Sequence, residues 1–276
     1  MKLVLTLLVR DEEDIIEQNL LYHLNRGVDQ VVVTDNNSTD GTRDILERYA
    51  RTGEVRIIDE RDDTYAQARW VTRMARLACS EHEADWIIHC DADEFWWPHR
   101  GDLKSCLEAI PETFGVVRVP SFDFVPVLDE ARPVEDRMIV RKARHGKFKV
   151  AHRADPGVSV AMGNHRLDET SLDTYSGQAP MMIFHFPARS YHQYETKVVN
   201  GGAAVARNPQ LPFETCQHWR ELYASFQNGR LEDHYQREVA HGSRRLIGGL
   251  MTRHLVIDRR LRRFLGSLRD ATPART

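Results

Sequence analysis

Two aspartates separated by a single residue follow a short apolar segment near residue 90. Residues 86–97 read Trp-Ile-Ile-His-Cys-Asp-Ala-Asp-Glu-Phe-Trp-Trp, so Asp91 and Asp93 stand where a predicted strand leaves the core. Since side chains alternate along an extended backbone, we expect both carboxylates on the same side of the strand. Mg²⁺ and Mn²⁺ prefer such oxygen ligands and complete their shells with water and phosphate oxygens. An isolated Asp-x-Asp also occurs in solvated acidic turns, so the surrounding sequence must decide between a metal site and such a turn.

Polar side chains also follow the three predicted strands that precede this one. In open α/β sheets, ligands bind beyond the carboxyl ends of the strands, so these loops should meet at one crevice. A nucleotide needs a polar partner for the base, another for the ribose and a cation for the diphosphate. The loops supply candidates for all three: Arg10 and Asp11, Asp35 to Asp40, Asp62 and Asp63, Gln67 and Arg69, and Asp91 and Asp93.

The spacing of apolar residues predicts the elements that position these loops. Strands are expected at residues 3–9, 31–34, 55–58 and 86–90, with amphipathic helices between them, the first two ended by Gly27 and Gly53. This alternation is typical of a mostly parallel α/β sheet. After Pro111 the extended segments are shorter, at 116–120, 138–141 and 147–152, and predict an antiparallel edge.

The C-terminal half reads as mainly helical. Ser190 and Gln193 form a capping-box pattern, so a helix should begin at Ser190, carry Lys197 and end at Gly201-Gly202. The Arg-rich stretch 243–270 is either a solvated helix packed on the domain or a surface for anionic lipid or an acidic partner. We therefore expect one domain at 1–215, divided at residue 98, and a helical extension at 216–276.

Composition narrows the classes of protein. The chain has 276 residues with 38 Lys plus Arg against 41 Asp plus Glu, a formal charge of -3, which argues against nucleic acid as a partner. The four cysteines form no C-x-x-C pair, which argues against a zinc site or disulfide framework and favours a reducing cytosol. No apolar run reaches the length of a membrane span, and residues 1–9 read as a first strand rather than a signal peptide. The expected location is cytoplasmic, with any membrane contact peripheral, at the inner face and through the basic C-terminal helix.

Three stretches resemble glycosyltransferases of family 2 with the GT-A fold, closest to the branch that includes family 92. The strand and charged turn Leu5-Thr6-Leu7-Leu8-Val9-Arg10-Asp11-Glu12 match the family's opening. The loop from Thr34 to Thr42 matches V-D-D-x-S-x-D-G-T, with Asn36 in place of an acid, and Asp91-Ala92-Asp93 matches its Asp-x-Asp. The resemblance covers residues 1–98, and a weaker match extends over 185–190 and Lys197. It implies that residues 1–215 form the catalytic domain, with a nucleotide-sugar half at 1–98 and an acceptor half at 99–215. It implies a GT-A-type, Rossmann-like, mostly parallel sheet with an antiparallel edge and C-terminal helices.

The resemblance also implies roles for individual residues. Asp35 would contact the nucleobase, Asp91 the ribose or a metal-bound water, and Asp93 the metal, with Arg10, Asp63 and Arg69 on the donor side. A histidine from the later half often completes the metal shell. His185, which ends the apolar segment 181–184, is the first candidate and His165 the second, although either could be structural. Lys197 could neutralise the departing diphosphate, or be an ordinary surface lysine.

The general base is the least defined residue. An inverting transfer needs an acid that deprotonates the acceptor hydroxyl, but the usual Glu-Asp motif of family 2 does not stand at the expected spacing. Asp168 and Glu169 are the nearest acids on a suitable loop, with Asp123 and Glu195 as alternatives. Glu94 is expected to support Asp93. Trp96 and Trp97 could stack on a sugar or belong to the core.

These residues predict a glycosyltransferase that depends on Mn²⁺ or Mg²⁺. It would move a sugar, with inversion, from a UDP- or GDP-linked donor to a hydroxyl of a glycan or lipid-linked acceptor. Two rivals remain at this point. One is a sugar nucleotidyltransferase, which normally carries a glycine-rich phosphate loop that residues 7–11 lack. The other is a catalytically inactive GT-A-like module that binds glycans or serves as a scaffold.

Overall fold

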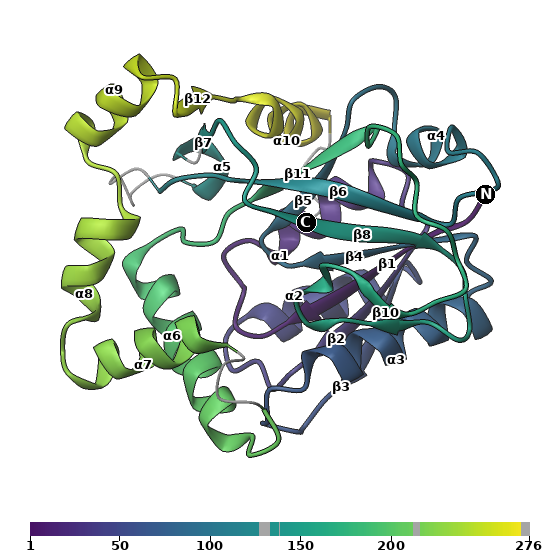
Figure 1. Ribbon diagram of the computed structural model, residues 1–276, viewed down its shortest axis with the longest axis horizontal. Coiled ribbons are helices and arrows are strands. Elements are labelled where there is room, and N and C mark those ends of the chain that lie inside the picture. The colour runs from purple at the N-terminus through teal and green to yellow at the C-terminus, as the bar shows by residue number, and fades with distance from the viewer. Residues whose placement is uncertain (127–132, 138, 212–215, 272–276) are drawn as a thin grey trace. The chain divides into compact units, whose positions relative to one another are not determined.

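The computed structural model describes residues 1–126, 133–137, 139–211 and 216–271 (Figure 1). Contacts divide the chain into two compact units, the first formed by Met1–Ser121 and His145–His185, the second by Phe122–Arg144 and Phe186–Thr276. Strands from the later half of the chain return to the sheet of the first unit, so these compact units do not correspond to the functional domains expected at 1–215 and 216–276, whose boundaries stay a prediction. The functional halves remain a prediction.

The first unit begins with the expected alternation of strands and helices. The elements are β1 (Leu3–Val9), α1 (Ile16–Leu24), β2 (Gln30–Asp35), α2 (Thr42–Ala50), β3 (Val55–Asp59), α3 (Gln67–Ser80) and β4 (Trp86–Asp91). The strands β3, β2, β1 and β4 are adjacent and parallel. In this register Val9 pairs with Asp35 and Leu8 with Asp91, so the carboxyl ends of β1, β2 and β4 lie at one edge of the sheet. The predicted α/β class is confirmed.

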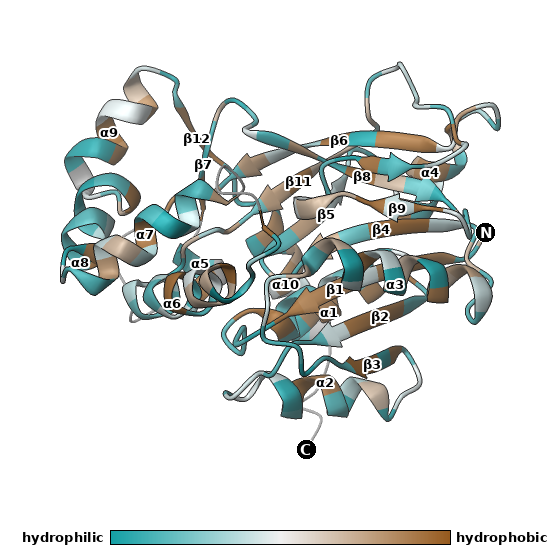
Figure 2. Cartoon of the chain, turned by 60° about the horizontal axis from the view of Figure 1, so that its bottom comes forward, coloured by the Kyte–Doolittle hydropathy of each residue, from teal (hydrophilic) through white to brown (hydrophobic). Residues whose placement is uncertain are grey.

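The centre of the sheet is buried because β1, β2 and β4 offer apolar side chains to both faces. In β1, Leu3, Leu5 and Leu7 alternate with Val4, and all four are fully buried. On the Val4 side, α3 packs its apolar stripe on the sheet (Figure 2), through the following cluster: Val4, Val32, Val71, Met74, Ala75, Ala78 and Ile87. Both faces are therefore covered, which fixes the strand ends that carry polar residues.

Antiparallel strands extend this sheet, as predicted. The full order is β3-β2-β1-β4-β8-β6-β11-β5, where β8 (Lys147–Arg153) is antiparallel to β4 and to β6, and β11 is antiparallel to β5. The remaining elements of the unit are β5 (Glu94–Pro98), α4 (Leu103–Glu108), β6 (Val116–Asp123), β9 (Ser159–Val160), a 3₁₀ turn (Met162–Asn164), β10 (Leu167–Glu169) and β11 (Met181–His185).

The chain around the acid pair differs from the expectation. The strand β4 ends at Asp91, a turn holds Ala92 and Asp93, and β5 begins at Glu94. Asp91 and Asp93 therefore do not alternate along one extended strand, and the turn sends the two carboxylates to different partners. The strand β5 was not predicted, since its residues Phe95 and Trp96, both buried, show no polar alternation that would distinguish a strand from an apolar loop.

The second unit is mainly helical. Its elements are α5 (Val134–Arg137), β7 (Val140–Lys142), α6 (Tyr191–Arg207), α7 (Gln217–Gln227), α8 (Leu231–His234), a π-helical turn (Tyr235–Val239), α9 (Ser243–Met251), β12 (Leu255–Ile257) and α10 (Arg260–Ala271). The Arg-rich stretch is thus two helices separated by a strand that pairs with β7. Met138, the start of one predicted strand, lies outside the described residues.

The helix α6 begins as predicted and ends later. Ser190 is its N-cap, and its hydroxyl accepts a hydrogen bond from the Gln193 amide at 3.1 Å. The prediction that Gly201-Gly202 ends the helix is wrong, because α6 continues to Arg207. A Cβ on Gly202 would lie 2.4 Å from Tyr223 Cβ in α7, so the glycines allow the two helices to approach closely.

All four cysteines are free thiols. Among the helices of the described residues, none combines the length and the apolar character needed to span a bilayer.

Candidate active site

Asp91, at the end of β4, is held by two side chains from the later half of the first unit. Lys149 of β8 donates from Nζ to Asp91 Oδ2 at 2.6 Å, and Asn164 donates from Nδ2 to Asp91 Oδ1 at 3.4 Å. Lys149 and Asn164 are buried, whereas the Asp91 side chain keeps 32% of its surface exposed. The carboxylate is thus fixed in orientation while one side of it remains open to a ligand.

Asp93, in the turn after β4, faces His185 at the end of β11. His185 Nε2 lies 3.7 Å from Asp93 Oδ1, and the Asp93 side chain is 1% exposed while that of His185 is 25% exposed. The antiparallel pairing of β5 with β11 sets His185 directly opposite Glu94. This register explains how two residues so far apart in the sequence come together.

Glu94 shares the ammonium of Lys149 with Asp91. Its Oε1 lies 3.0 Å from Lys149 Nζ, and its Oε2 accepts from the backbone amide of Asp91 at 3.1 Å. Burial raises the pKa of Glu94 to about 7, because the nearby Lys149 only partly replaces the lost water. Burial also opposes the charge on Lys149, but Asp91 and Glu94 outweigh it and raise its pKa, so the ammonium persists at neutral pH.

Buried polar groups of α1 hold the backbone of this turn. Asn19 donates from Nδ2 to the carbonyls of Ala92, at 2.9 Å, and Glu94, at 2.8 Å. His23 Nδ1 lies 3.0 Å from Asn19 Oδ1, and His23 Nε2 accepts from the Trp96 amide at 3.2 Å. These bonds satisfy backbone groups that lie out of reach of water, so the turn between Asp91 and Glu94 is rigid.

The donor set at Asp93 and His185 fits a divalent cation. Two ligands of a six-coordinate ion, each about 2.1 Å from it, lie about 3 to 4.2 Å apart, and the separation of 3.7 Å between Nε2 and Oδ1 falls within this range. Within the described residues, no three His, Cys, Asp or Glu side chains form a metal-binding group. Such an ion would therefore depend on water and on phosphate oxygens for the rest of its shell.

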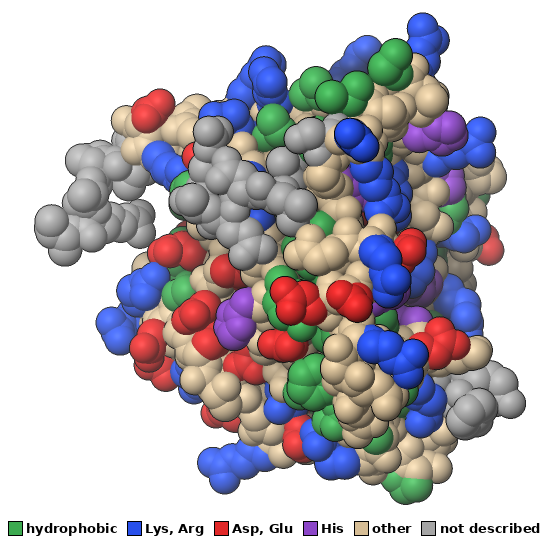
Figure 3. Space-filling model, turned by 90° about the vertical axis from the view of Figure 1, so that its left-hand side faces the viewer, with side chains coloured by type: hydrophobic (Ala, Val, Ile, Leu, Met, Phe, Trp, Pro, Cys, Tyr) green, Lys and Arg blue, Asp and Glu red, His purple; other side chains and the backbone are tan. Residues whose placement is uncertain are grey.

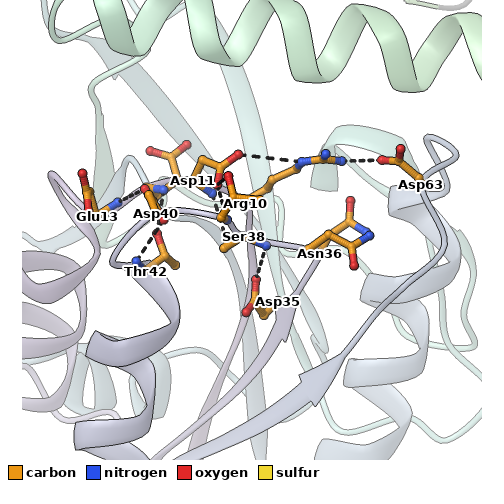
Figure 4. A network of polar contacts seen from close by, with 12 residues as sticks. Arg10, Asp11, Glu13, Asp35, Asn36, Ser38, Asp40, Thr42 and Asp63 are labelled. Atoms are coloured by element: carbon orange, nitrogen blue, oxygen red, sulfur yellow. Dashed lines mark hydrogen bonds and ion pairs between the residues drawn. The ribbon is translucent and has the colours of Figure 1, made fainter.

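Loops after β1, β2 and β3 are tied to one another beside this edge of the sheet (Figure 4). Asp35, at the end of β2, is 6% exposed and accepts from the Ser38 amide at 3.1 Å. Asn36 donates from Nδ2 to the carbonyls of Glu60, at 3.1 Å, and Asp62, at 2.8 Å. A carboxylate at position 36, as in the family pattern, could not donate these bonds. The two hydrogen bonds therefore explain why an asparagine fits this position.

Three further donor-side candidates lie on these loops. Arg10 NH1 donates to Asp63 at 2.6 Å, and Arg10 Nε lies 3.9 Å from Asp11 (Figure 4). Arg69, in the first turn of α3, pairs with Asp62 at 2.5 Å and is 66% exposed. Arg10 and Asp63 are thus positioned by each other, whereas Arg69 projects into solvent.

The other candidates have these surroundings. Asp168 and Glu169 are exposed on β10, where Asp168 accepts from Arg166 at 2.9 Å. His165 Nδ1 lies 2.7 Å from the Phe148 carbonyl, and burial lowers the pKa of its imidazole.

The aromatic candidates and those of the second unit have other contacts. Trp96 is fully buried and belongs to the core, and Trp97 stacks on Phe184. In the second unit, Lys197 lies within α6, Asp123 pairs with Lys142 at 2.9 Å and Glu195 accepts from Tyr191 at 2.9 Å.

Three residues of this site were not predicted from the sequence: Lys149, Asn164 and Asn19. A weak signal existed for Asn19, which shares the apolar face of α1 with Ile16, Leu20 and His23 and must therefore find a buried partner. Lys149 gives a similar signal, since it stands in the buried strand segment Lys149 to His152. Neither signal names the partner.

The chain was compared with protein-family models, curated proteins and solved structures. The sequence model of glycosyl transferase family 2 matches residues 8–173. Among solved structures, TarS 1–349 from S. aureus in complex with UDP-GlcNAc is 12% identical, over 86% of this chain and 73% of that chain, with a TM-score of 0.45. Glucosyl-3-phosphoglycerate synthase from Mycobacterium tuberculosis, in complex with Mn²⁺, UDP and glucosyl-3-phosphoglycerate, is 18% identical over 44% of each chain, with a TM-score of 0.31. No curated protein matches the chain.

The match to the family covers more than half of the chain and includes the loops after β1, β2, β3 and β4. It confirms the resemblance to family 2, while the branch related to family 92 remains a prediction. This match argues against the alternative of a sugar nucleotidyltransferase. The chain belongs to glycosyl transferase family 2, and it is a glycosyltransferase of the GT-A fold.

Proposed function

We propose that the chain transfers a sugar, with inversion, from a UDP- or GDP-linked donor to a hydroxyl of a glycan or lipid-linked acceptor, and that the transfer depends on Mn²⁺ or Mg²⁺. The proposal rests chiefly on one observation, the approach of His185 Nε2 to within 3.7 Å of Asp93 Oδ1 at the carboxyl edge of the sheet. The rigid support of Asp91 by Lys149 and Asn164 is consistent with it.

In this proposal Asp93 and His185 hold the cation. A bound Mg²⁺ or Mn²⁺ would stabilise the negative charge that develops on the leaving diphosphate. Asp91 contacts the ribose or a water of the metal shell, and Lys149 keeps its carboxylate in place. Lys149 also offsets one of the negative charges in this cluster, so binding of the cation should rely on the donor's phosphates.

Asp35 is proposed to recognise the base, with Arg10, Asp63 and Arg69 around the donor. Asp35 is nearly buried and its Oδ1 is bonded to the Ser38 amide, which would hold it ready for a base edge. Losing one charge-assisted hydrogen bond costs on the order of 1.5 to 3 kcal/mol. We therefore expect Asp35→Ala to weaken UDP or GDP by about tenfold to a hundredfold and inorganic pyrophosphate by much less. Equal losses for both ligands would contradict this role.

Activation of the acceptor needs an acid, for which Asp168 and Glu169 stay as candidates. Both are exposed, so a bound acceptor would have to bury one of them to raise its pKa towards neutrality. Lys197 is proposed to neutralise the departing diphosphate. Each of these roles is tested by one variant: Asp168→Asn, Glu169→Gln or Lys197→Ala. A variant that removes a true catalytic group should lower turnover at saturating donor and leave the affinity for the donor unchanged.

Calorimetry tests the metal proposal directly. We expect Mn²⁺ to increase the affinity of the wild-type protein for UDP or GDP, and Asp93→Asn and His185→Ala to abolish this increase. Asp44→Asn, an exposed aspartate of α2, is the matched control and should behave like wild type. Equal nucleotide affinity with Mn²⁺ and with a chelator in the wild-type protein would overturn the assignment.

A further inference from the structure

Exposed apolar side chains are concentrated in one short part of the second unit. Large hydrophobic residues that stand in solvent are Met1, Ile247, Met251, Val256 and Ile257 among the described residues, and four of these five fall within residues 247–257. Met251 is 80% exposed and Ile247 57% exposed. Single exposed apolar residues are ordinary, but a cluster of this kind marks a contact surface.

The helix α9 has two apolar faces with different surroundings. In α9, Leu246 and Leu250 pack against the small core formed by Val125, Val140 and Leu255. Ile247 and Met251, also one turn apart, lie beside that face and point away from the core. The fold of the unit therefore uses Leu246 and Leu250 and leaves Ile247 and Met251 available.

Positive charge is concentrated in the same segment. Residues 243–271 contain eight arginines, no lysine and only two acids, although the whole chain carries a net charge of -3. Seven of the arginines are exposed: Arg244, Arg245, Arg253, Arg259, Arg262, Arg263 and Arg269. Hydrophobic and Lys or Arg side chains stand side by side at the top of the surface in Figure 3, at the level of α9 in Figure 1.

We propose that residues 243–271 form a docking surface for a membrane that contains anionic lipid. Apolar side chains flanked by arginine are what the boundary between headgroups and acyl chains accepts: Ile247 and Met251 enter the apolar layer while arginines pair with phosphates. The attraction is specific to this segment, since the remainder of the chain is acidic. The surface would bring the enzyme to lipid-bound molecules.

Vesicle flotation tests this proposal with the full chain. We expect the wild-type protein to bind phosphatidylcholine vesicles that contain about a third phosphatidylglycerol at low salt, and to be released as salt is raised. Pure phosphatidylcholine vesicles should not retain it. Ile247→Ser/Met251→Ser should lower binding by tenfold or more, and because both residues are exposed, its circular dichroism should match wild type.

A pair of charge variants separates a local patch from general electrostatics. Arg244→Gln/Arg259→Gln should weaken binding about 25-fold, since each basic residue near the surface contributes about a factor of five. Arg51→Gln/Arg100→Gln removes the same charge from exposed positions in the first unit and should change binding less than about twofold. Equal losses in the two pairs would overturn the proposal.

Two further results would also overturn it. One is a wild-type protein that ignores anionic vesicles at low salt. The other is a concentration-dependent dimer, measured by light scattering, that Ile247→Ser/Met251→Ser abolishes without altering vesicle binding, which would assign the face to a second copy of the chain.

Discussion

Charged side chains at the turn after β4 are mostly buried and contact one another, whereas those of residues 243–271 stand mostly in solvent. At the turn, Lys149 bridges Asp91 and Glu94, and Asp93 faces His185. In the Arg-rich segment, exposed arginines flank exposed Ile247 and Met251. The first region loses stability if one partner is removed, while the second can change with little cost to the fold.

The largest difference should appear on acidification, because the first region rests on histidines that are buried and neutral. Burial lowers the pKa of His23 to about 3 and of His152 to about 4, and holds that of His89 well below 6.5. Below pH 6.5 these histidines bind protons in the unfolded chain but stay neutral in the folded chain, so the free energy of unfolding falls as the pH drops. Glu94, whose folded pKa is about 7, opposes this by binding a proton in the folded state.

The net difference is about two protons, which corresponds to a loss of about 3 to 5 kcal/mol between pH 6.5 and 4.5. Urea unfolding across this range measures it. His152→Asn removes one titrating group and should flatten the slope, whereas vesicle binding through arginine should vary little with pH. A free energy of unfolding that stays constant from pH 6.5 to 4.5 would contradict the assignment of neutral buried histidines.

Asn19→Ala should cause the next largest effect, because two buried carbonyls of the turn lose their donor. Each unsatisfied group costs about 1–3 kcal/mol, so we expect a loss of about 2–5 kcal/mol in urea unfolding. Asn25→Ala is the matched control, since Asn25 is exposed and bonds only within α1; it should cost less than about 1 kcal/mol. Similar losses for both variants would show that the turn does not depend on Asn19.

Asn36→Asp should destabilise the loops by about 1–3 kcal/mol, since a carboxylate would face two carbonyl oxygens. Asn37→Asp is the control, because Asn37 is exposed and its bond to the Arg61 carbonyl is 3.3 Å long. Thermal unfolding gives the stability, and calorimetry with UDP or GDP shows whether the donor site loosens with it. A stable Asn36→Asp protein would mean that the loops close without this amide.

The smallest effect is expected in the Arg-rich segment. Ile247→Ser/Met251→Ser should change the free energy of unfolding by less than about 0.5 kcal/mol, because both side chains already face water. Leu255→Ala, in the core under α9, should cost about 2–4 kcal/mol. If the serine variant were as unstable as Leu255→Ala, Ile247 and Met251 would belong to the core and the proposed docking face would be lost.

The sequence by itself determined the parallel half of the sheet and the location of the acids. Strands β1, β2 and β4 contain long apolar segments and β3 a shorter one, all separated by amphipathic helices, and both patterns are local. Asp35, Asp91 and Asp93 directly follow those segments, so their place near the carboxyl edge could be predicted. The cap at Ser190 was predictable for the same reason, since it depends on residues three apart.

Only the tertiary structure decided which side chains meet. His185 reaches Asp93 through the pairing of β5 with β11, and Lys149 reaches Asp91 and Glu94 through β8. Such pairings depend on register between distant segments, about which local periodicity carries no information. The glycines at 201 and 202 were misread for a related reason. Glycine often ends a helix because its helix propensity is low. Here the missing Cβ of Gly202 makes room for Tyr223 of α7, and that contact outweighs the propensity.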